Sequence, residues 1–355
     1  MKSLKQSIEF ERSLGHQVWI CSGNLRNQDQ NHIYISSLTR SINPYSDVHA
    51  LIQLARAVEK VNPDIIHSHE SKAGILTRAL SLKFKNRIFV HTVHMATFHS
   101  KGNTFLEFLY ALIEKAMAKR TDYLIFVSPA LKQIFENKKI FAKRASIVVR
   151  SRVNLELFRL RRESRNADGI SIRRFLQIAE NSICIIHVGL LEDRKRPDFI
   201  LASLAEFLKS QEQANLIFLG EGPKLSHLLE LASTLGVSEK VHFVGFVDDA
   251  ELWMSGSDAL VLASTFEGFP QVAIQAAALG LPVIATPLEE YNGCNFIHKL
   301  QSGDSMRASL EALLAVRRLP KTFFDEELLD WNSGSINHQH EAFLVQVDNE
   351  DIGRR

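Results

Sequence analysis

Glu267 opens the segment of this chain best suited to binding an anionic ligand, Glu267-Gly-Phe-Pro-Gln-Val-Ala-Ile-Gln275. The segment stands between apolar residues 259–263 and 282–285, a pattern that predicts a strand, a tight loop, a small-residue helix and a second strand. Glycine and proline let a backbone approach a ligand closely, and the first amides of a helix attract an anion. The residues predicted to bind ligand here are Glu267, Gly268, Phe269, Pro270 and Gln275.

A cationic segment follows another predicted strand, residues 183–188. It reads His187-Val-Gly-Leu-Leu-Glu-Asp-Arg-Lys-Arg196, so a glycine at 189 precedes three consecutive cations. Cations on a loop at the end of a strand can bind an anion, preferably through a guanidinium. Gly189, Arg194, Lys195 and Arg196 are therefore a candidate anion site, with a solvated basic turn as the alternative.

Both segments closely resemble those of the retaining GT-B-fold glycosyltransferases known as family 4. In that family a second acid follows the first by eight residues, where this chain has Gln275. The family's arginine directly follows the glycine, where this chain has Leu190, and its lysine corresponds to Lys195. The resemblance implies that Glu267 holds the donor sugar, Gln275 the ribose and Lys195 the diphosphate. Arg194 and Arg196 are the candidates to replace the missing arginine.

Two further loops resemble the family's nucleotide-binding segments. Leu219-Gly220-Glu-Gly222-Pro223 ends a predicted strand and corresponds to a loop beside the nucleotide, although Gly-x-Gly-Pro alone usually marks only a turn. The run Val241-His-Phe-Val-Gly-Phe246-Val is similar to the strand and turn that hold the donor base. Phe246 fits two interpretations equally, a neighbour of the base or a core residue.

Histidines end two predicted strands of the N-terminal half, at His67 and His69 and at His91 and His94. A histidine at a strand end is more often structural than functional. In the family, a histidine at the position of His94 lies near the donor sugar and acceptor, so the resemblance implies that role here. It also implies that no metal and no cofactor is needed, because protein cations stabilise the leaving nucleoside diphosphate of the donor substrate.

The elements that must position these residues alternate as strands and helices, which predicts an α/β fold with parallel sheets. We expect two Rossmann-like, doubly wound domains facing a cleft, as in GT-B, over residues 1–160 and 161–334, with about 335–355 returning to the first. The chain begins inside the family's first helix, so we expect a truncated N-terminal domain without the first strand and its glycine loop. Residues 159–169 are polar and predict the interdomain linker. The predicted strands are residues 17–21, 64–67, 88–92, 123–127, 146–149, 183–188, 214–219, 241–244, 259–263 and 282–285.

The predicted helices of the first half span residues 46–60, 72–82 and 104–119. The last has apolar residues at helical spacing, which predicts that this face packs into the core. These residues are Phe105, Phe108, Leu109, Leu112, Ile113 and Ala116.

Composition places the chain among globular proteins, with 45% apolar and 23% charged residues. It contains no run of about 18 apolar residues and no apolar signal-peptide core at its start. Cys21, Cys184 and Cys294 have no metal-ligand spacing, and we expect reduced core thiols and a cytoplasmic protein.

Charge is divided along the chain. Residues 1–175 hold 29 Lys and Arg against 14 Asp and Glu, and the remainder holds 13 against 26. This division predicts that the N-terminal domain meets an anionic membrane surface, peripherally and on the inner face, with solvated basic helices as the alternative. A nucleic-acid partner is less favoured because no binding module accompanies the charge. The basic residues expected at the membrane are Lys83, Lys85, Arg87, Lys138, Lys139, Lys143 and Arg144.

Together these features predict a glycosyltransferase that moves a sugar from a nucleoside diphosphate sugar to a surface polysaccharide or lipid-linked acceptor with retention. Leu190 and Gln275 keep open an alternative, a non-catalytic relative that binds a nucleotide sugar or a partner protein. A GT-B sugar-nucleotide epimerase is a third interpretation, for which the expected acid and base residues are less evident.

Overall fold

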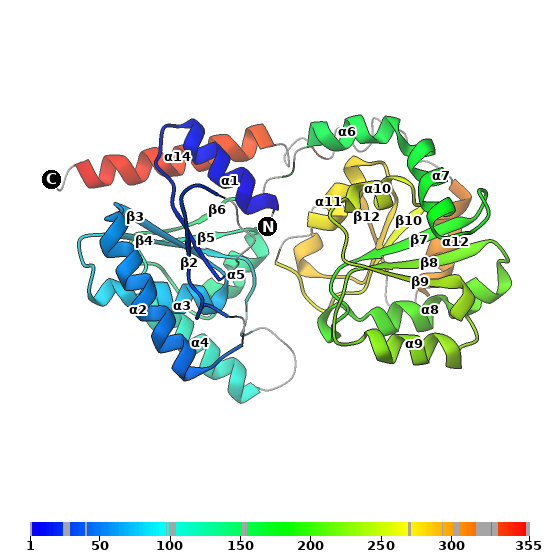
Figure 1. Ribbon diagram of the computed structural model, residues 1–355, viewed down its shortest axis with the longest axis horizontal. Helices are drawn as coiled ribbons and strands as arrows, with labels where there is room; N and C mark the ends of the chain where they lie inside the picture. Colours follow the sequence, from blue (N-terminus) through cyan, green and yellow to red (C-terminus); the bar gives the residue numbers. More distant parts are fainter. Residues whose placement is uncertain are drawn as a thin grey trace. The chain divides into compact units, whose positions relative to one another are not determined.

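The structure is a computed structural model that describes residues 2–23, 29–39, 41–96, 98, 104–150, 153, 155–268, 271–292, 294–300, 305–316, 328 and 333–352. The chain divides into two compact units, Met1–Arg152 with Ile336–Arg355, and Val153–Ser335. Each unit has its own parallel sheet and apolar core (Figure 1). The predicted α/β fold class with two parallel-sheet domains is confirmed.

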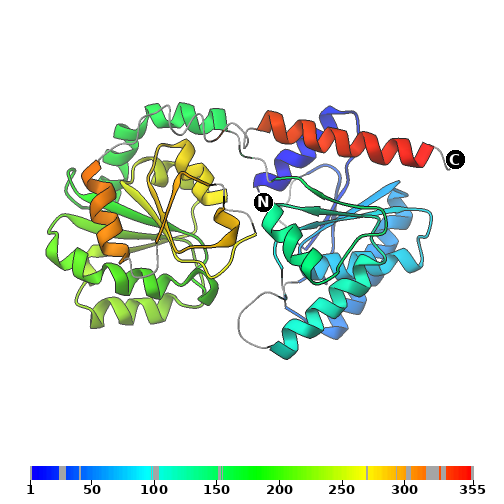
Figure 2. The same cartoon turned by 180° about the vertical axis from the view of Figure 1, so that it is seen from behind.

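The first unit is built on a four-stranded parallel sheet in the order β3-β4-β5-β6. One face of this sheet is covered by helices α2 and α3 with α4 beside them, and the other by α14 through Phe343 and Val347 (Figures 1 and 2). The elements are α1 (Lys2–Ser13), β1 (Ile20–Ser22), β2 (His32–Tyr34), α2 (Pro44–Val61), β3 (Ile65–His69), α3 (Ser71–Ala79), η1 (Leu80–Leu82), β4 (Ile88–Val93), α4 (Thr104–Ala118), β5 (Tyr123–Phe126), α5 (Pro129–Asn137), β6 (Ala145–Val148) and α14 (Ser333–Ile352).

The second unit has a six-stranded parallel sheet in the order β12-β11-β10-β7-β8-β9. Strand order therefore reverses between β7 and β10, as in a dinucleotide-binding Rossmann sheet. Its elements are α6 (Leu155–Glu163), α7 (Arg165–Phe175), β7 (Ile183–Val188), η3 (Asp193–Lys195), α8 (Pro197–Ser210), β8 (Ala214–Leu219), α9 (Leu225–Thr234), η4 (Ser238–Lys240), β9 (Val241–Gly245), α10 (Ala250–Ser255), β10 (Ala259–Leu262), α11 (Gln271–Ala278), β11 (Val283–Ala285), η5 (Glu289–Tyr291), β12 (Ile297–Lys299) and α12 (Met306–Val316).

Most of the expected elements are present. Each of the ten predicted strands overlaps a strand of the structure, whereas the short strands β2 and β12 were not predicted. All three cysteines are free thiols, and Cys184 and Cys294 are buried. The expectation of a core thiol is wrong for Cys21, which is exposed.

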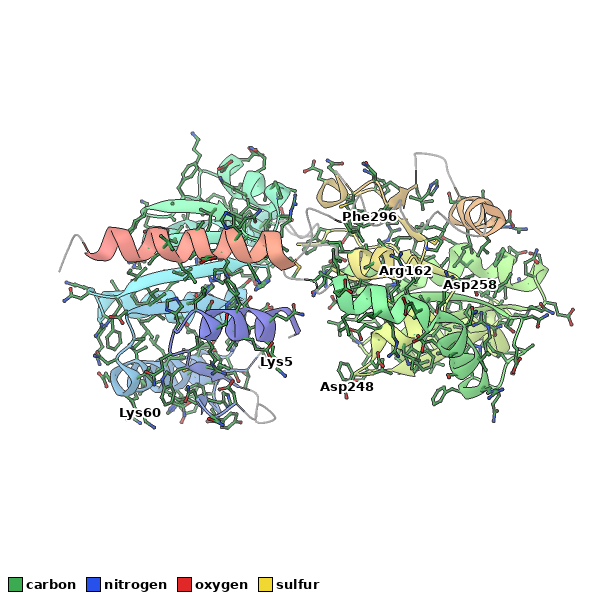
Figure 3. All side chains as sticks on the ribbon, turned by 90° about the horizontal axis from the view of Figure 1, so that it is seen from above. Lys5, Lys60, Arg162, Asp248, Asp258 and Phe296 are labelled. Carbon is green, nitrogen blue, oxygen red and sulfur yellow. The ribbon has the colours of Figure 1, made fainter. Side chains whose placement is uncertain are left out.

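The predicted linker at residues 159–169 is wrong, because this segment belongs to α6 and α7 of the second unit. Arg161 and Arg162 of this segment are partly buried and make specific contacts. Arg161 forms ion pairs with Asp168 at 3.1 Å and with Asp249 at 3.0 Å. Arg162, labelled in Figure 3, donates two hydrogen bonds to the carbonyl of Ala278, at 3.2 and 2.7 Å. Specific acceptors on the second unit therefore order a segment whose polar composition resembles a loop.

The predicted burial of the apolar face of α4 is wrong for Phe105, Phe108, Leu109 and Leu112, which are exposed, whereas Ile113 and Ala116 are partly buried. Phe105 is 70% exposed, Phe108 67% and Leu112 53%. The helix packs instead through its opposite face, where Glu114 pairs with Arg78 of α3. A buried ion pair has thus decided which side of this amphipathic helix faces the sheet.

Candidate functional site

The loops that follow β7 and β10 meet at the reversal of strand order in the second unit. The two strands are neighbours, and β7 leads into Gly189 while β10 leads into Ser264 and Glu267. Ligands of open parallel sheets bind outside the carboxyl ends of the strands at such a reversal. The fold therefore brings together two segments that are about 70 residues apart in sequence.

The carboxylate of Glu267 is the centre of this site. Its Oε1 accepts a hydrogen bond from Ser264 Oγ at 2.5 Å and another from Lys195 Nζ. Arg194 Nη1 approaches Oε2 at 3.4 Å. The three charged side chains are 12–20% exposed, so solvent screens them only partly.

Backbone contacts hold the two loops in register. The amide of Thr265 donates to the carbonyl of Arg194 at 2.9 Å, and Arg194 Nη1 also reaches the carbonyl of Phe266 at 3.4 Å. The arrangement supplies two cations and one carboxylate at one point. Such a set can hold a diphosphate and, beside it, a ligand hydroxyl that donates to the carboxylate.

The other cation predicted for this site, Arg196, takes a different direction. It adopts a left-handed backbone conformation with φ of 49° at the start of α8, and its guanidinium lies 4.2 Å from the ring centroid of Phe199. Leu190, at the position of the family's arginine, is 41% exposed. Of the two candidates to replace that arginine, the structure brings only Arg194 to Glu267.

The glycines predicted to bind ligand have distinct local environments. A Cβ on Gly189 would meet only ordinary contacts, with His187 Nε2 at 3.5 Å and Lys195 Cε at 3.6 Å. A Cβ on Gly220, whose φ is +142°, would overlap the carbonyl oxygen of Gly189, and one on Gly222 would overlap that of Leu191. The last two glycines therefore allow neighbouring loops to approach each other, whereas Gly189 leaves space beside Lys195.

The remaining predicted residues of the second unit are described only in part. Phe246 follows β9 and is 71% exposed, which rules out the interpretation as a core residue and leaves that of a base neighbour as a prediction. Gly268 is buried, and Gln275 is partly buried on α11. Phe269 and Pro270 lie outside the described residues.

His187 is a residue that the motif comparison did not assign to the site. It is fully buried, and its Nδ1 donates to the carbonyl of Val261 at 3.0 Å, which leaves Nε2 as an acceptor. Nε2 has no hydrogen-bond partner among the described residues. Burial lowers the pKa of His187 to about 4. A histidine ending a strand two residues before the glycine was the available signal in the sequence.

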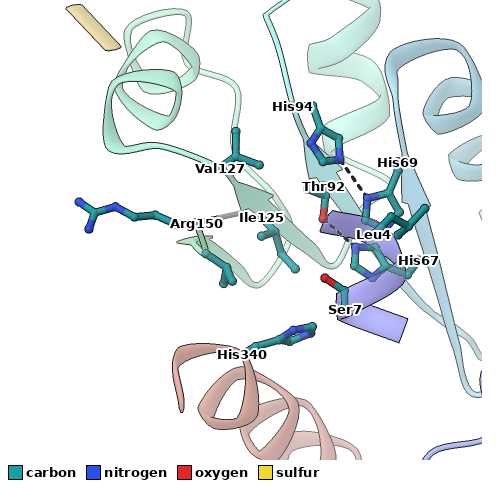
Figure 4. Close-up of a pocket in the computed structure, with 11 residues that line it drawn as sticks. Leu4, Ser7, His67, His69, Thr92, His94, Ile125, Val127, Arg150 and His340 are labelled. Carbon is teal, nitrogen blue, oxygen red and sulfur yellow. Dashed lines mark hydrogen bonds between the residues drawn. The ribbon is translucent and has the colours of Figure 1, made fainter. Parts of the chain in front are cut away.

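The strand-end histidines of the first unit line a cavity of about 50 Å³ (Figure 4). His69 Nδ1 and His94 Nε2 are hydrogen-bonded at 3.1 Å, and His67 Nε2 lies 2.7 Å from Thr92 Oγ1. His340 of α14 also lines the cavity. Burial lowers the pKa of His94, lowers that of His67 to about 3, and lowers that of His69 well below its usual value. Burial therefore favours the neutral form of His67, His69 and His94 in this cavity.

Glu70, directly after His69, was not singled out in the sequence. Its φ of 65° and ψ of 151° lie in a region that residues with a Cβ rarely adopt, and it forms the N-cap position of α3 without a side-chain hydrogen bond. Its carboxylate raises the pKa of His94, opposing the larger effect of burial. A strained acid beside His94 is the kind of feature that clusters at functional sites.

The described residues contain neither a metal-binding cluster nor a membrane-spanning helix. No group of three or more His, Cys, Asp or Glu side chains there is arranged to hold a metal ion. No described helix is long and apolar enough to cross a membrane.

Two family models match the chain. The model for glycosyl transferases group 1 matches residues 169–295, and the model for Glycosyltransferase Family 4 matches residues 8–156. A UDP-Gal:alpha-D-GlcNAc-diphosphoundecaprenol alpha-1,3-galactosyltransferase of Escherichia coli is 26% identical over 269 residues, which are 75% of this chain and 68% of the relative. An alpha-monoglucosyldiacylglycerol synthase of Streptococcus pneumoniae is 24% identical over 301 residues, 80% of this chain and 67% of the relative.

Solved structures share the fold at low sequence identity. Sucrose-phosphate synthase from Thermosynechococcus elongatus matches with a TM-score of 0.78 and 19% identity over 98% of this chain and 93% of that chain. Anabaena HepE in complex with UDP matches with a TM-score of 0.67 and 18% identity over 84% and 82%. Together with the family models and the reversal of strand order in the second unit, these matches show that the chain belongs to the family 4 glycosyltransferases of the GT-B fold.

Proposed function

We propose that this protein transfers a sugar, with retention, from a nucleoside diphosphate sugar to a lipid-linked or surface polysaccharide acceptor. The observation that carries the proposal is the convergence of Lys195, Arg194 and Glu267 at the reversal of strand order. A sugar nucleotide offers the matching groups, a diphosphate for the cations and sugar hydroxyls for the carboxylate.

During transfer, the bond between the sugar C1 and the diphosphate oxygen breaks, and the oxygen of an acceptor hydroxyl forms a new bond to C1 on the same face. The hydroxyl proton passes to the departing diphosphate. Negative charge then grows on the departing diphosphate. Lys195 and Arg194 are partly buried, so their charges stabilise it more than solvated cations would. The step proposed here needs no metal, because protein cations neutralise the leaving group.

Glu267 would orient the sugar through its hydroxyls, and Gln275 would contact the ribose. Holding donor and acceptor in one geometry lowers the entropic part of the barrier. His94, which is in the first unit, would line the transfer point as a neutral imidazole. UDP in the related HepE structure supports a uridine nucleotide as the first donor to test.

The acceptor class is proposed from the relatives. The relative from Escherichia coli is named for a diphosphoundecaprenol acceptor and the relative from Streptococcus pneumoniae for a diacylglycerol glycolipid. Both names join a sugar to a lipid. We accordingly propose a lipid-anchored acceptor for this chain.

The alternative is a relative that binds a nucleotide sugar or partner without transfer, which Leu190 and Gln275 favour. Two assays distinguish transfer from binding alone. Isothermal titration measures binding of UDP-sugars, and a second assay measures release of UDP in the presence of a polyprenyl-diphosphate-linked sugar. Binding with acceptor-dependent UDP release supports transfer. Binding without release from any acceptor supports the alternative, and no binding of nucleotide sugars would contradict both.

A further inference from the structure

The exposed side of α4 is an apolar stripe that no described element covers. Phe108 is 67% exposed, Leu109 39% and Leu112 53%. The stripe occupies the first three turns of the helix. Burial of such side chains is favourable, and in the folded unit these three remain largely in contact with solvent.

The opposite side of α4 fixes this orientation. Arg78 of α3 donates to both oxygens of Glu114, at 2.9 and 3.1 Å, and the two side chains are only 0% and 6% exposed. Separating a buried pair of this kind leaves two uncompensated charges in the protein interior. The helix therefore cannot rotate to bury Phe108 and Leu112 without breaking this pair.

The charges on α4 complement an anionic surface. Residues 108, 112, 115 and 119 follow one another at helical spacing, so Lys115 and Lys119, both exposed, continue the face of Phe108 and Leu112. The carboxylates in the helix sequence lie on the other side, with Glu107 partly buried and Glu114 paired to Arg78. Residues 1–152 hold 23 Lys and Arg against 11 Asp and Glu.

We propose that α4 lies on the surface of an anionic lipid bilayer. Phe108, Leu109 and Leu112 enter the boundary between headgroups and acyl chains, and Lys115 and Lys119 contact lipid phosphates. Amphipathic helices with an apolar face and flanking lysines bind membranes in this way. Each lysine near such a surface adds an electrostatic attraction to anionic lipid, which salt screens.

This position differs from the basic clusters that the sequence suggested. In the structure Lys83 pairs with Glu59, while Lys143 and Arg144 lie 3.8 and 3.6 Å from Asp122. Neighbouring carboxylates thus offset part of the charge at Lys83, Lys143 and Arg144. On α4 the exposed lysines adjoin apolar side chains that gain from entering a lipid surface.

The location of α4 connects the inference to the proposed function. The helix joins the parallel strands β4 and β5, so it begins at the carboxyl ends of the strands, the edge that carries His94. Its apolar turns are those nearest this edge. The inference rests on the proposed function in one respect, since a bilayer there would present a lipid-anchored acceptor to His94.

Vesicle sedimentation with the full chain tests the inference without donor or acceptor. The probes are vesicles of phosphatidylglycerol and phosphatidylethanolamine in a 3:7 ratio, compared with pure phosphatidylcholine. We expect binding to the first that falls with added salt, and little binding to the second. The double variant Phe108→Ser/Leu112→Ser should bind about tenfold more weakly or worse.

The matched control is Phe141→Ser, a similarly exposed aromatic at 53% that adjoins the basic residues Lys139 and Lys143. It should bind like the wild type, and circular dichroism should show native folding for all variants. Lys115→Gln/Lys119→Gln should weaken binding and flatten its salt dependence. Equal binding by the Phe108→Ser/Leu112→Ser variant, or a loss caused by Phe141→Ser instead, would overturn the proposal.

A second copy of the chain is the competing occupant. Analytical ultracentrifugation tests this alternative. If the wild type is a dimer that does not bind vesicles, and Phe108→Ser/Leu112→Ser makes it monomeric, the stripe is a dimer interface and the bilayer proposal is overturned. The vesicle assay is independent of the proposed sugar transfer. A protein that binds vesicles through α4 but releases no UDP supports the bilayer inference and contradicts the proposed transfer.

Discussion

Acidification should destabilise the first unit through its buried histidines. The perturbation is a fall from pH 7.5 to pH 5.5. Burial lowers the pKa of His67 to about 3, and lowers the pKa values of His69 and His91 well below their usual value. The groups facing them are His94, His340, Thr92 and Ser68, with Arg78 lowering the pKa of His91 further.

The direction of the change in stability follows from which state, folded or unfolded, binds more protons. These imidazoles stay neutral in the folded state, whereas in the unfolded chain they take up protons below about pH 6.5. Stability is therefore complete above pH 6.5 and decreases as pH falls, for His67 until about pH 3. At pH 5.5 each such group favours unfolding by about 1.4 kcal/mol. Three groups together remove about 4 kcal/mol, a large share of a typical total of about 5–15 kcal/mol.

The assay is urea unfolding, followed by circular dichroism, of the wild type and His67→Gln at several pH values. Glutamine can keep the hydrogen bond to Thr92 but does not titrate, so the variant should lose about 1.4 kcal/mol less between pH 7.5 and pH 5.5. The control is His227→Gln, where solvent reaches the exposed imidazole in both states and the pH profile should not change. Parallel pH profiles for the wild type and His67→Gln would refute the reasoning.

The remaining predictions concern the donor site. Glu267→Ala should abolish transfer while Gln275→Ala weakens donor binding only modestly, because a carboxylate accepts a hydrogen bond more strongly than an amide, by about 1–2 kcal/mol per bond. Transfer rates measure the first effect and titration the second, and full activity of Glu267→Ala would contradict the assignment. Lys195→Ala should cost about 2–4 kcal/mol in the transition state, read from kcat/KM, and an unchanged value would place this loop away from the diphosphate. Gly189→Ala should fold normally but bind donor less well. Gly220→Ala should lower the melting temperature, because its Cβ would overlap a backbone oxygen at a position with positive φ. A large loss of stability in Gly189→Ala would refute this distinction.

The amino-acid sequence by itself determined the fold class and singled out the two loops that meet at the reversal of strand order. Alternation of apolar strands with helical patterns is set by local periodicity, so all ten predicted strands overlap observed ones. Glycine and charged residues at strand ends also drew attention to Glu267 and Lys195, which are in contact in the structure. The carboxyl edge of a parallel sheet gathers such loops wherever they occur in the chain.

Tertiary structure decided which charged residues meet. Arg194 and Arg196 look equivalent in sequence, yet only Arg194 reaches Glu267, because Arg196 stacks on Phe199. Residues 159–169 have the composition of a linker but are ordered by acceptors on α10 and α11, more than 80 residues away.

The orientation of α4 was also decided by tertiary structure. Its helical period predicts an apolar face but does not say whether that face turns inward. The buried pair of Arg78 and Glu114, 36 residues apart, turns it outward. Pairings over such distances depend on the folded backbone, which a local pattern does not contain.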